Sequence, residues 1–382
     1  MSSRCGRVWM LGFAILVAGC GDDGAPPGNA PWEIDALLGE TEAGGFAHAR
    51  EPRPFVFPED HGPHPRYRSE WWYFTGNLET DTGRRFGYQW TLFRFALAPR
   101  PPQSPSHWAT NQVYMGHFAL TDPAAGRFHS AERISRAAID LAGVRAAPFR
   151  AWVENWQVAE EGDTGIWRLQ AEAADGTAVD LALERRKPVV LQGDRGLSQK
   201  SAEPGNASYY YSFTRMASAG TVTVDGETHR VRGWSWMDRE WSTSALGPDQ
   251  EGWDWFALQL QDGTDLMFYR LRRADGSVDP HSTGTLVDAR GNVQRLAWRD
   301  IELEVLEHWR SPRGAEYPSR WRVRLPTHEL AFTVTPVLAD QEHDLSVRYW
   351  EGAVDVEGTR AGEPIRGRGY VELAGYGDRR GR

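Results

Sequence analysis

Aromatic and acidic side chains alternate in one short segment, WSWMDRE at residues 234–240. Because side chains of a strand alternate between its two faces, Trp234, Trp236, Asp238 and Glu240 are predicted to share one face. If that face is inward and apolar, burial raises the pKa of the carboxyl groups and produces a proton donor near neutral pH. Such an acid can protonate an isolated alkene, and aromatic faces stabilise the carbocation that water then captures.

A structural role for the same carboxylates is the competing interpretation. An Asp238–Arg239 pair, or a pair between Glu240 and an arginine, would close the seam between two domains without doing chemistry. The segment therefore predicts either an acid catalyst, with Asp238 and Glu240 as its carboxylates, or a structural ion pair.

Aromatic residues elsewhere in the chain are further candidates for the same cavity. Tyr209 and Tyr211 precede the acidic segment, and a tyrosine hydroxyl there could orient a carboxyl group or a water molecule. Trp255 and Tyr269 are predicted ligand-binding residues. Glu70 and Trp72 alternate onto one face of an earlier strand and form a second candidate pocket. For any single aromatic side chain, filling a barrel interior is the alternative role.

Several other chemistries lack their sequence signatures. The eleven histidines form no HExxH motif, and His61 and His64 lie in a loop rich in Pro and Gly, so no metal site is predicted. His117 has apolar neighbours and is predicted to be a core residue. The chain has no G-x-S-x-G elbow and no dinucleotide fingerprint, so no cofactor is expected. A net charge of −9 argues against nucleic acid as a partner.

The rest of the chain predicts the strands that must position these groups. Aromatic residues make up 12% of the 382 residues and 40 glycines punctuate them, which favours an all-β fold. Asp-Gly pairs at 225–226 and 262–263 separate alternating runs and predict hairpins. The one segment with helical character is 130–141.

An internal repeat indicates two similar β domains. Residues 71–78 (WWYFTGNL) align without gaps to residues 253–260 (WDWFALQL), an offset of 182. Three later matches keep the same order, so duplication explains them better than chance. We predict two consecutive lipocalin-like antiparallel β-barrel domains, at 51–215 and 216–380, each large enough to enclose one small ligand.

The N-terminus is predicted to be an export signal. Arg4 and Arg7 precede an apolar stretch at 8–18, which is too short to span a bilayer as a helix. Residues 16–20 (LVAGC) resemble the lipobox of bacterial lipoproteins, which are cut before the Cys. The predicted signal peptide is therefore 1–19, and Cys20 is the expected lipidation site. A tether at 20–50 follows. Gly21 after Cys20 favours the outer membrane of the bacterial envelope.

Six motifs resemble the AttH/carotenoid 1,2-hydratase family. They are HPRY at 64–67, EWWY at 70–73, TGNL at 75–78, GYQWTLFR at 87–94, GWSWMDREW at 233–241 and WDWF at 253–256. The resemblance implies two lipocalin-like domains and, by analogy with the hydratases, an acid at Asp238 in the aromatic-x-Asp segment. Tyr209 and Tyr211 stand where the hydratases are expected to have His and Trp, which is a departure from the hydratase pattern.

Three functions remain open from the sequence. The first is a membrane-anchored lipocalin-like protein that binds a hydrophobic small molecule, a lipid or an isoprenoid. The second is a hydratase or cyclase that uses Asp238 as acid, with Trp236, Glu240 and Tyr211 in support. The third is an accessory partner of an ABC-type transporter, which the genetic neighbourhood of AttH relatives implies.

Overall fold

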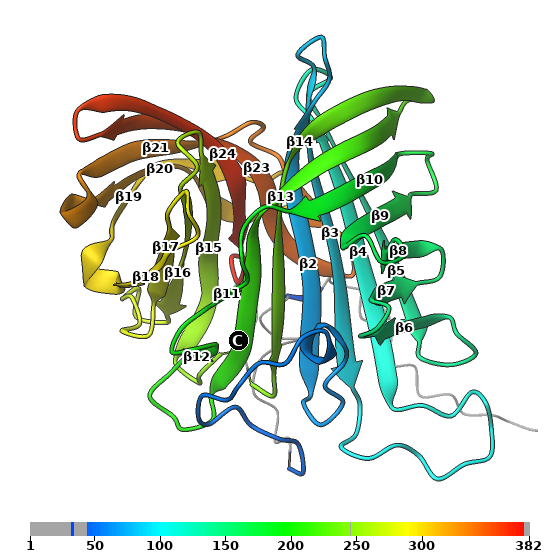
Figure 1. The fold of residues 1–382 in the computed structure, drawn as a ribbon. Coiled ribbons are helices and arrows are strands. Elements are labelled where there is room, and N and C mark those ends of the chain that lie inside the picture. The colour runs from blue at the N-terminus through cyan, green and yellow to red at the C-terminus, as the bar shows by residue number, and fades with distance from the viewer. Residues whose placement is uncertain (1–31, 34–43, 245, 378–382) are drawn as a thin grey trace, which may run out of the picture. The chain divides into compact units, whose positions relative to one another are not determined.

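The computed structural model describes residues 32–33, 44–244 and 246–377 (Figure 1). The predicted signal peptide, Cys20 and most of the predicted tether lie outside the described residues. Within the described part, strands form two large sheets, and three short 3₁₀ helices are present: η1 (Glu59–His61), η2 (Trp298–Asp300) and η3 (Pro326–His328). No helix there is long and apolar enough to cross a membrane. The predicted all-β fold with two antiparallel β domains is confirmed.

The first sheet has 13 strands, which lie between residues 69 and 242. They are β2 (Ser69–Glu79), β3 (Arg85–Ala96), β4 (Gln112–Asp122), β5 (Arg127–Arg136), β6 (Ala142–Arg145), β7 (Arg150–Val153), β8 (Trp156–Glu160), β9 (Ile166–Glu172), β10 (Ala178–Arg185), β11 (Val190–Leu191), β12 (Leu197–Gln199), β13 (Ala207–Val224) and β14 (Glu227–Ser242). Their order is β5-β4-β3-β2-β14-β13-β10-β9-β8-β7-β6, with β11 and β12 on β13.

The second sheet has 11 strands. They are β15 (Gln250–Leu260), β16 (Asp265–Arg273), β17 (Thr283–Val287), β18 (Val293–Ala297), β19 (Glu302–Arg310), β20 (Glu316–Leu325), β21 (Leu330–Pro336), β22 (Glu342–Asp344), β23 (Val347–Arg360), β24 (Glu363–Leu373) and β1 (Trp32–Glu33), which pairs with β23 in parallel. The order is β18-β17-β16-β15-β24-β23-β21-β20-β19, with β22 also on β23.

The two strand orders match from β5 to β8 in the first sheet and from β18 to β19 in the second, while β7 and β6 have no counterpart in the second order. The repeated segments lie in β2 and β15, and each pairs on one side with the next strand of its hairpin. On the other side each pairs with the strand of its sheet that comes last in the sequence, β14 for β2 and β24 for β15. The sequence repeat therefore corresponds to equivalent strands of two equivalent sheets.

Each sheet packs around a hydrophobic core of its own, and a third cluster draws residues from both sheets. Tyr73, Tyr210 and Trp236 of the first sheet lie in this cluster with Trp255 and Tyr370 of the second. Because alternate residues of a strand point to opposite faces, a strand such as β14 supplies one face to its own core and the other to this shared cluster.

The helical interpretation of 130–141 is wrong, because residues 127–136 form β5, which pairs along its whole length with β4. Pairing with a neighbouring strand has overridden a weak local helical preference. The expected domain boundary between residues 215 and 216 lies inside β13, whereas the sheets change over between Ser242 and Gln250.

Candidate functional site

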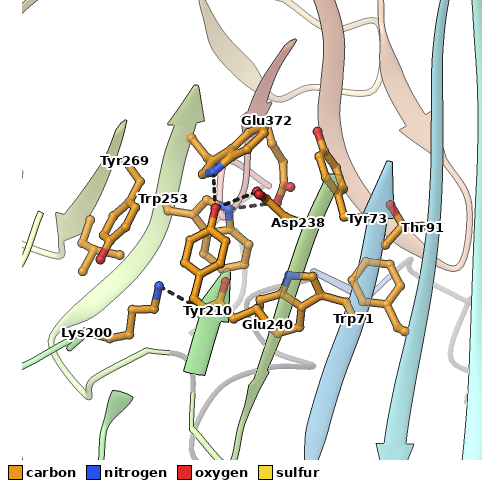
Figure 2. Close-up of a pocket in the computed structure, with 13 residues that line it drawn as sticks. Trp71, Tyr73, Thr91, Lys200, Tyr210, Asp238, Glu240, Trp253, Tyr269 and Glu372 are labelled. Carbon is orange, nitrogen blue, oxygen red and sulfur yellow. Dashed lines mark hydrogen bonds and ion pairs between the residues drawn. The ribbon is translucent and has the colours of Figure 1, made fainter. Parts of the chain in front are cut away.

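A cavity of about 80 Å³ lies where β2, β13 and β14 of the first sheet meet β15, β16 and β24 of the second (Figure 2). Its walls combine aromatic rings with carboxyl groups and one ammonium group. The lining residues are Trp71, Tyr73, Thr91, Phe93, Lys200, Tyr210, Asp238, Glu240, Trp253, Trp255, Tyr269, Leu271 and Glu372. This composition, an apolar wall with a few convergent polar groups, is typical of a small-molecule site.

Asp238 of β14 is buried, and three donors meet its carboxyl group. Ser212 Oγ donates to Oδ1 at 2.5 Å and Trp236 Nε1 to the same oxygen at 2.7 Å. The Tyr210 hydroxyl donates to Oδ2 at 2.6 Å (Figure 2). Burial raises the pKa of Asp238 to about 7 against these hydrogen bonds, which favour the carboxylate. The group therefore exchanges its proton near neutral pH.

The donors to Asp238 are themselves held by further donors. Trp255 Nε1 donates to the Tyr210 hydroxyl at 3.2 Å, and Gln192 Nε2 donates to Ser212 Oγ at 2.8 Å. Each hydroxyl oxygen accepts a hydrogen bond from one of these N–H groups. Its own proton is therefore left to donate to the Asp238 carboxyl group. This arrangement stabilises the carboxylate that remains after Asp238 gives up a proton.

Glu372 of β24 is a second acid at the cavity. Trp253 Nε1 donates to its Oε1 at 2.8 Å, and Glu351 lies opposite it on the neighbouring strand β23, so the two carboxyl groups are neighbours. Burial, opposed by the hydrogen bond from Trp253, raises the pKa of Glu372 to about 7. Burial and the neighbouring Glu372 raise the pKa of Glu351 well above its ordinary range.

Lys200 and Glu240 form an ion pair at the same cavity. Lys200 Nζ lies 3.0 Å from Glu240 Oε1 and 4.4 Å from the centre of the Tyr269 ring. Burial alone would lower the pKa of Lys200, but Glu240 outweighs it and the pKa is raised. Ser208 Oγ also donates to Glu240. The pair is neutral as a whole, so the free charge of the cavity depends on Asp238 and Glu372.

The structure brings several of the predicted residues together. The cavity is lined by Asp238, Glu240, Trp255 and Tyr269. Trp236 is not one of its lining residues but donates a hydrogen bond to Asp238. Trp234 belongs to the same face of β14 but lies farther along it, 42% exposed, beneath the Arg215 guanidinium. It does not line this cavity.

Other predicted residues face the core of the first sheet instead. Tyr211 shares a 2.6 Å hydrogen bond with His61 Nδ1, and Tyr209 donates to the carbonyl oxygen of Glu51. Glu70 and Trp72 lie on the opposite face of β2 from the cavity, where Glu70 pairs with two arginines. None of these four side chains lines the cavity around Asp238.

Tyr210, rather than its neighbours, is the tyrosine that contacts Asp238, and a β-bulge explains why. Counted from the turn at 225–226, the ladder places Val224 opposite Glu227, which would put residue 213 opposite Asp238. The register shifts by one between Phe213 and Met216, so Ser212 lies opposite Asp238 instead. A shift of one residue exchanges the two faces of a strand.

Six further residues at or beside the cavity were not predicted from the sequence: Lys200, Tyr73, Trp71, Trp253, Glu351 and Glu372. The repeat offered one signal: Trp71 and Tyr73 correspond to Trp253 and Trp255 at the offset of 182. Lys200 was visible as one of only two lysines in the chain, the other being Lys187. Glu351 and Glu372 follow no such motif: Glu372 reaches the cavity because β24 pairs with β15, and Glu351 lies beside Glu372 because β23 pairs with β24.

The structural interpretation of the acidic segment is wrong in its partners. Arg239 pairs with Glu70 and not with Asp238, because adjacent residues of a strand point to opposite faces. Glu240 pairs with Lys200 and not with an arginine. His117 is buried as predicted, hydrogen-bonded to Tyr349 at 2.8 Å. Within the described ranges, no three His, Cys, Asp or Glu residues are grouped to hold a metal ion.

The raised pKa values predict a pH dependence of stability. Between about pH 4 and pH 7 the folded protein holds protons on Asp238 and Glu372 that the unfolded chain releases. The contribution of these two groups to the free energy of unfolding is therefore expected to fall as the pH rises through this window and to level off above it. His61 and His343, whose pKa values burial lowers, act in the opposite direction, so the prediction concerns the difference between wild type and variant. Urea unfolding of wild type and Asp238→Asn at pH 5 and pH 8 measures it: wild type should lose stability relative to the variant between the two pH values, and an equal change in both would contradict a titrating Asp238.

Comparison with known proteins gives consistent findings. The AttH-like family model matches residues 48–376. The chain is similar to the crystal structure of an AttH protein from Nitrosomonas europaea, with 37% identity and a TM-score of 0.76 over 87% of this chain and 100% of that chain. It also shares its fold with kievitone hydratase from Nectria haematococca, at 14% identity and a TM-score of 0.66 over 91% and 98% of the chains. No curated protein matches it.

Proposed function

The chain belongs to the AttH-like family, and we propose that it binds a hydrophobic small molecule, a lipid or an isoprenoid, and hydrates one of its double bonds. One observation carries the proposal: a buried carboxyl group that titrates near neutral pH, Asp238, lies among tryptophan and tyrosine rings at a cavity. The fold shared with a kievitone hydratase is consistent with this reaction class, as is the resemblance of the sequence motifs to the same family.

The size and charge of the cavity favour the end of an apolar molecule. A volume of about 80 Å³ holds only a few water-sized groups, so a long ligand can place no more than one end in it. The ion pair of Lys200 with Glu240 cancels its own charge, and Asp238 is neutral when protonated. A neutral alkene is therefore a better fit than a charged metabolite.

The proposed reaction begins with proton transfer from Asp238. Its O–H bond breaks as a C–H bond forms at one alkene carbon, and the other carbon becomes cationic. The three donors from Ser212, Trp236 and Tyr210 then meet a full carboxylate, so they bind the product of proton transfer more strongly than the neutral acid. Trp71 and Trp255 line the cavity in which the cation would form, and an aromatic ring stabilises a cation beside its face.

Mass spectrometry in ¹⁸O-labelled water tests the proposal. The full-length chain is incubated with a lipid extract of bacterial membranes, and bound and released molecules are compared. A released product that contains the heavy oxygen is expected with wild type. Molecules that are retained with unchanged mass would indicate a carrier and contradict hydration, and an unlabelled isomer would indicate a cyclase or isomerase.

Tyr210→Phe is expected to lower the rate of product formation by about tenfold, because one hydrogen bond to the developing carboxylate is lost. The same loss removes a donor that lowers the pKa of Asp238, so the pH range in which the acid is protonated should extend upward. Rate measurements from pH 5 to pH 9 check both effects. Tyr211→Phe is the matched control, since its hydroxyl contacts His61 away from the cavity; equal effects of the two variants would contradict the assignment.

We also propose that the protein is exported and anchored through Cys20 in the bacterial envelope, with an ABC-type transporter as a candidate partner. These proposals rest on the N-terminal sequence and on the resemblance. Metabolic labelling with a tagged fatty acid should mark the wild type and leave Cys20→Ser unlabelled. Consistent absence of a transporter from purifications in mild detergent would remove that partner.

A further inference from the structure

The internal duplication places two acids at equivalent positions, one from each sheet. Asp238 of β14 lies opposite Tyr73 of β2, and Glu372 of β24 lies opposite Trp255 of β15. Tyr73 and Trp255 correspond in the repeat, and both carboxyl groups border the same cavity (Figure 2). The cavity thus has an acid on each of two walls, and alkene hydration needs two proton transfers: one to carbon and one from water.

Glu351 fixes the protonation of the second acid. The Tyr73 hydroxyl donates to Glu351 Oε1 at 2.7 Å. Among the described residues, Glu351 Oε2 is buried and has no hydrogen-bond partner, and Glu372 lies opposite Glu351 on the neighbouring strand. Two buried neighbouring carboxyl groups cannot easily carry two negative charges, so the pair is expected to hold one proton, which leaves Glu372 as a carboxylate that can accept another.

We propose that Glu372 is the catalytic base that takes the proton of the attacking water, and that Glu351 is a positioning residue that holds the shared proton. The inference rests on the proposed hydration. It assigns the two transfers to different halves of the duplicated fold: Asp238 of the first sheet gives a proton to carbon, and Glu372 of the second receives one from water.

The step balances without another reactant. Asp238 loses its proton and the alkene gains a C–H bond; the oxygen of water forms a C–O bond to the cationic carbon and its O–H bond breaks toward Glu372. Alkene and water give an alcohol, Asp238 ends as a carboxylate and Glu372 as a carboxylic acid. Transfer of a proton from Glu372 back to Asp238 through water in the cavity restores the starting state. Burial raises the pKa of Glu372 to about 7, which suits a base at neutral pH.

Infrared spectroscopy of the full-length protein tests the shared proton without any substrate. Wild type at pH 9 is expected to show the carbonyl band of a protonated carboxyl group, and Glu351→Gln should lose it. Glu357→Gln, on the exposed part of the same strand, is the control and should keep it. A wild-type spectrum without the band at pH 9, or a band that survives in Glu351→Gln, would overturn the shared proton.

Isotope exchange tests the catalytic role, with citronellol as the probe because it carries a terminal isoprenoid double bond. Incubated in D₂O enriched in ¹⁸O, wild type should place deuterium in the recovered alkene and ¹⁸O in the tertiary alcohol product. Glu372→Gln is expected to keep the deuterium exchange and to lose about 100-fold of the ¹⁸O product, whereas Asp238→Asn should lose both.

The outcomes separate the inference from the proposed function. If Glu372→Gln forms the ¹⁸O alcohol as fast as wild type, Glu372 is not the base, although hydration stands. If wild type gives neither label while the infrared band is present, hydration of this alkene class fails and the catalytic assignment of Glu372 fails with it. Glu351→Gln should lower the ¹⁸O rate and shift its pH optimum, an effect that a merely structural residue would not have.

Discussion

Replacing Asp238 by asparagine is expected to lower hydration by about 10²- to 10⁴-fold and to leave the protein folded. Asparagine has the same shape, and its amide oxygen can accept from Ser212 and Trp236 as the carboxyl Oδ1 does. Its amide N–H₂ would face the Tyr210 hydroxyl, which can accept a hydrogen bond by rotating its own proton. The variant therefore removes the transferable proton with little change in packing.

Product formation in ¹⁸O-labelled water measures the loss, and thermal unfolding together with near-ultraviolet circular dichroism checks the fold. Asp225→Asn is the control, because Asp225 lies in an exposed turn and pairs only with the exposed Arg127. Full activity of Asp238→Asn would contradict the assignment of Asp238 as the acid. Loss of the fold in that variant would instead make Asp238 a structural residue, and the hydratase proposal would lose its principal support.

Replacing Glu70 by glutamine is expected to lower the free energy of unfolding by about 3–5 kcal/mol, the cost of removing one partner from a buried ion pair. Glu70 is completely buried and contacts the guanidinium groups of Arg94 and Arg239, which are themselves buried. Burial works against its negative charge, but the two arginines outweigh it and hold its pKa well below the ordinary range. A glutamine would leave two buried positive charges without a counterion.

Denaturant unfolding at pH 7 measures this loss, and the exposed pair of Arg127 with Asp225 again gives the comparison. Both side chains of that pair are more than half exposed, and Asp225→Asn should change the unfolding free energy by less than about 1 kcal/mol. Equal effects of the two substitutions would mean that the charges around Glu70 are solvated in solution. A loss of hydration without loss of stability in Glu70→Gln would place Glu70 in the active site after all.

Local patterns in the sequence determined much of the fold. The Asp-Gly pairs at 225–226 and 262–263 lie at hairpin turns, and Asp225 and Gly226 both have positive φ, as such tight turns require. Alternation placed Trp236, Asp238 and Glu240 correctly on one face of one strand. The repeat at an offset of 182 predicted two equivalent β domains, since duplicated strands keep the same neighbours. The family resemblance read from the motifs is confirmed by the family match over residues 48–376.

What alternation leaves open is which of the two faces meets the cavity. For Tyr209, Tyr210 and Tyr211 the answer depends on the bulge between Phe213 and Met216, which shifts the ladder by one residue and turns Tyr210 toward Asp238. For Glu70 and Trp72 the face depends on Arg94 and Arg239, which are buried in the first sheet. Their positive charges need the Glu70 carboxylate as a counterion, so Glu70 faces them and not the cavity. Neither a bulge nor a distant counterion has a local signature.

The second acid shows the same limit over a longer distance. Glu372 lies 134 residues beyond Asp238 in the sequence, and Glu351 reaches it only because β23 pairs with β24. The sequence by itself thus determined the hairpins at 225–226 and 262–263, the duplication, and two carboxyl groups of the site, Asp238 and Glu240. Only the tertiary structure decided which side chains share the cavity and which carboxyl groups hold their protons, because burial and charge neighbours, which set those pKa values, arise when the two sheets pack.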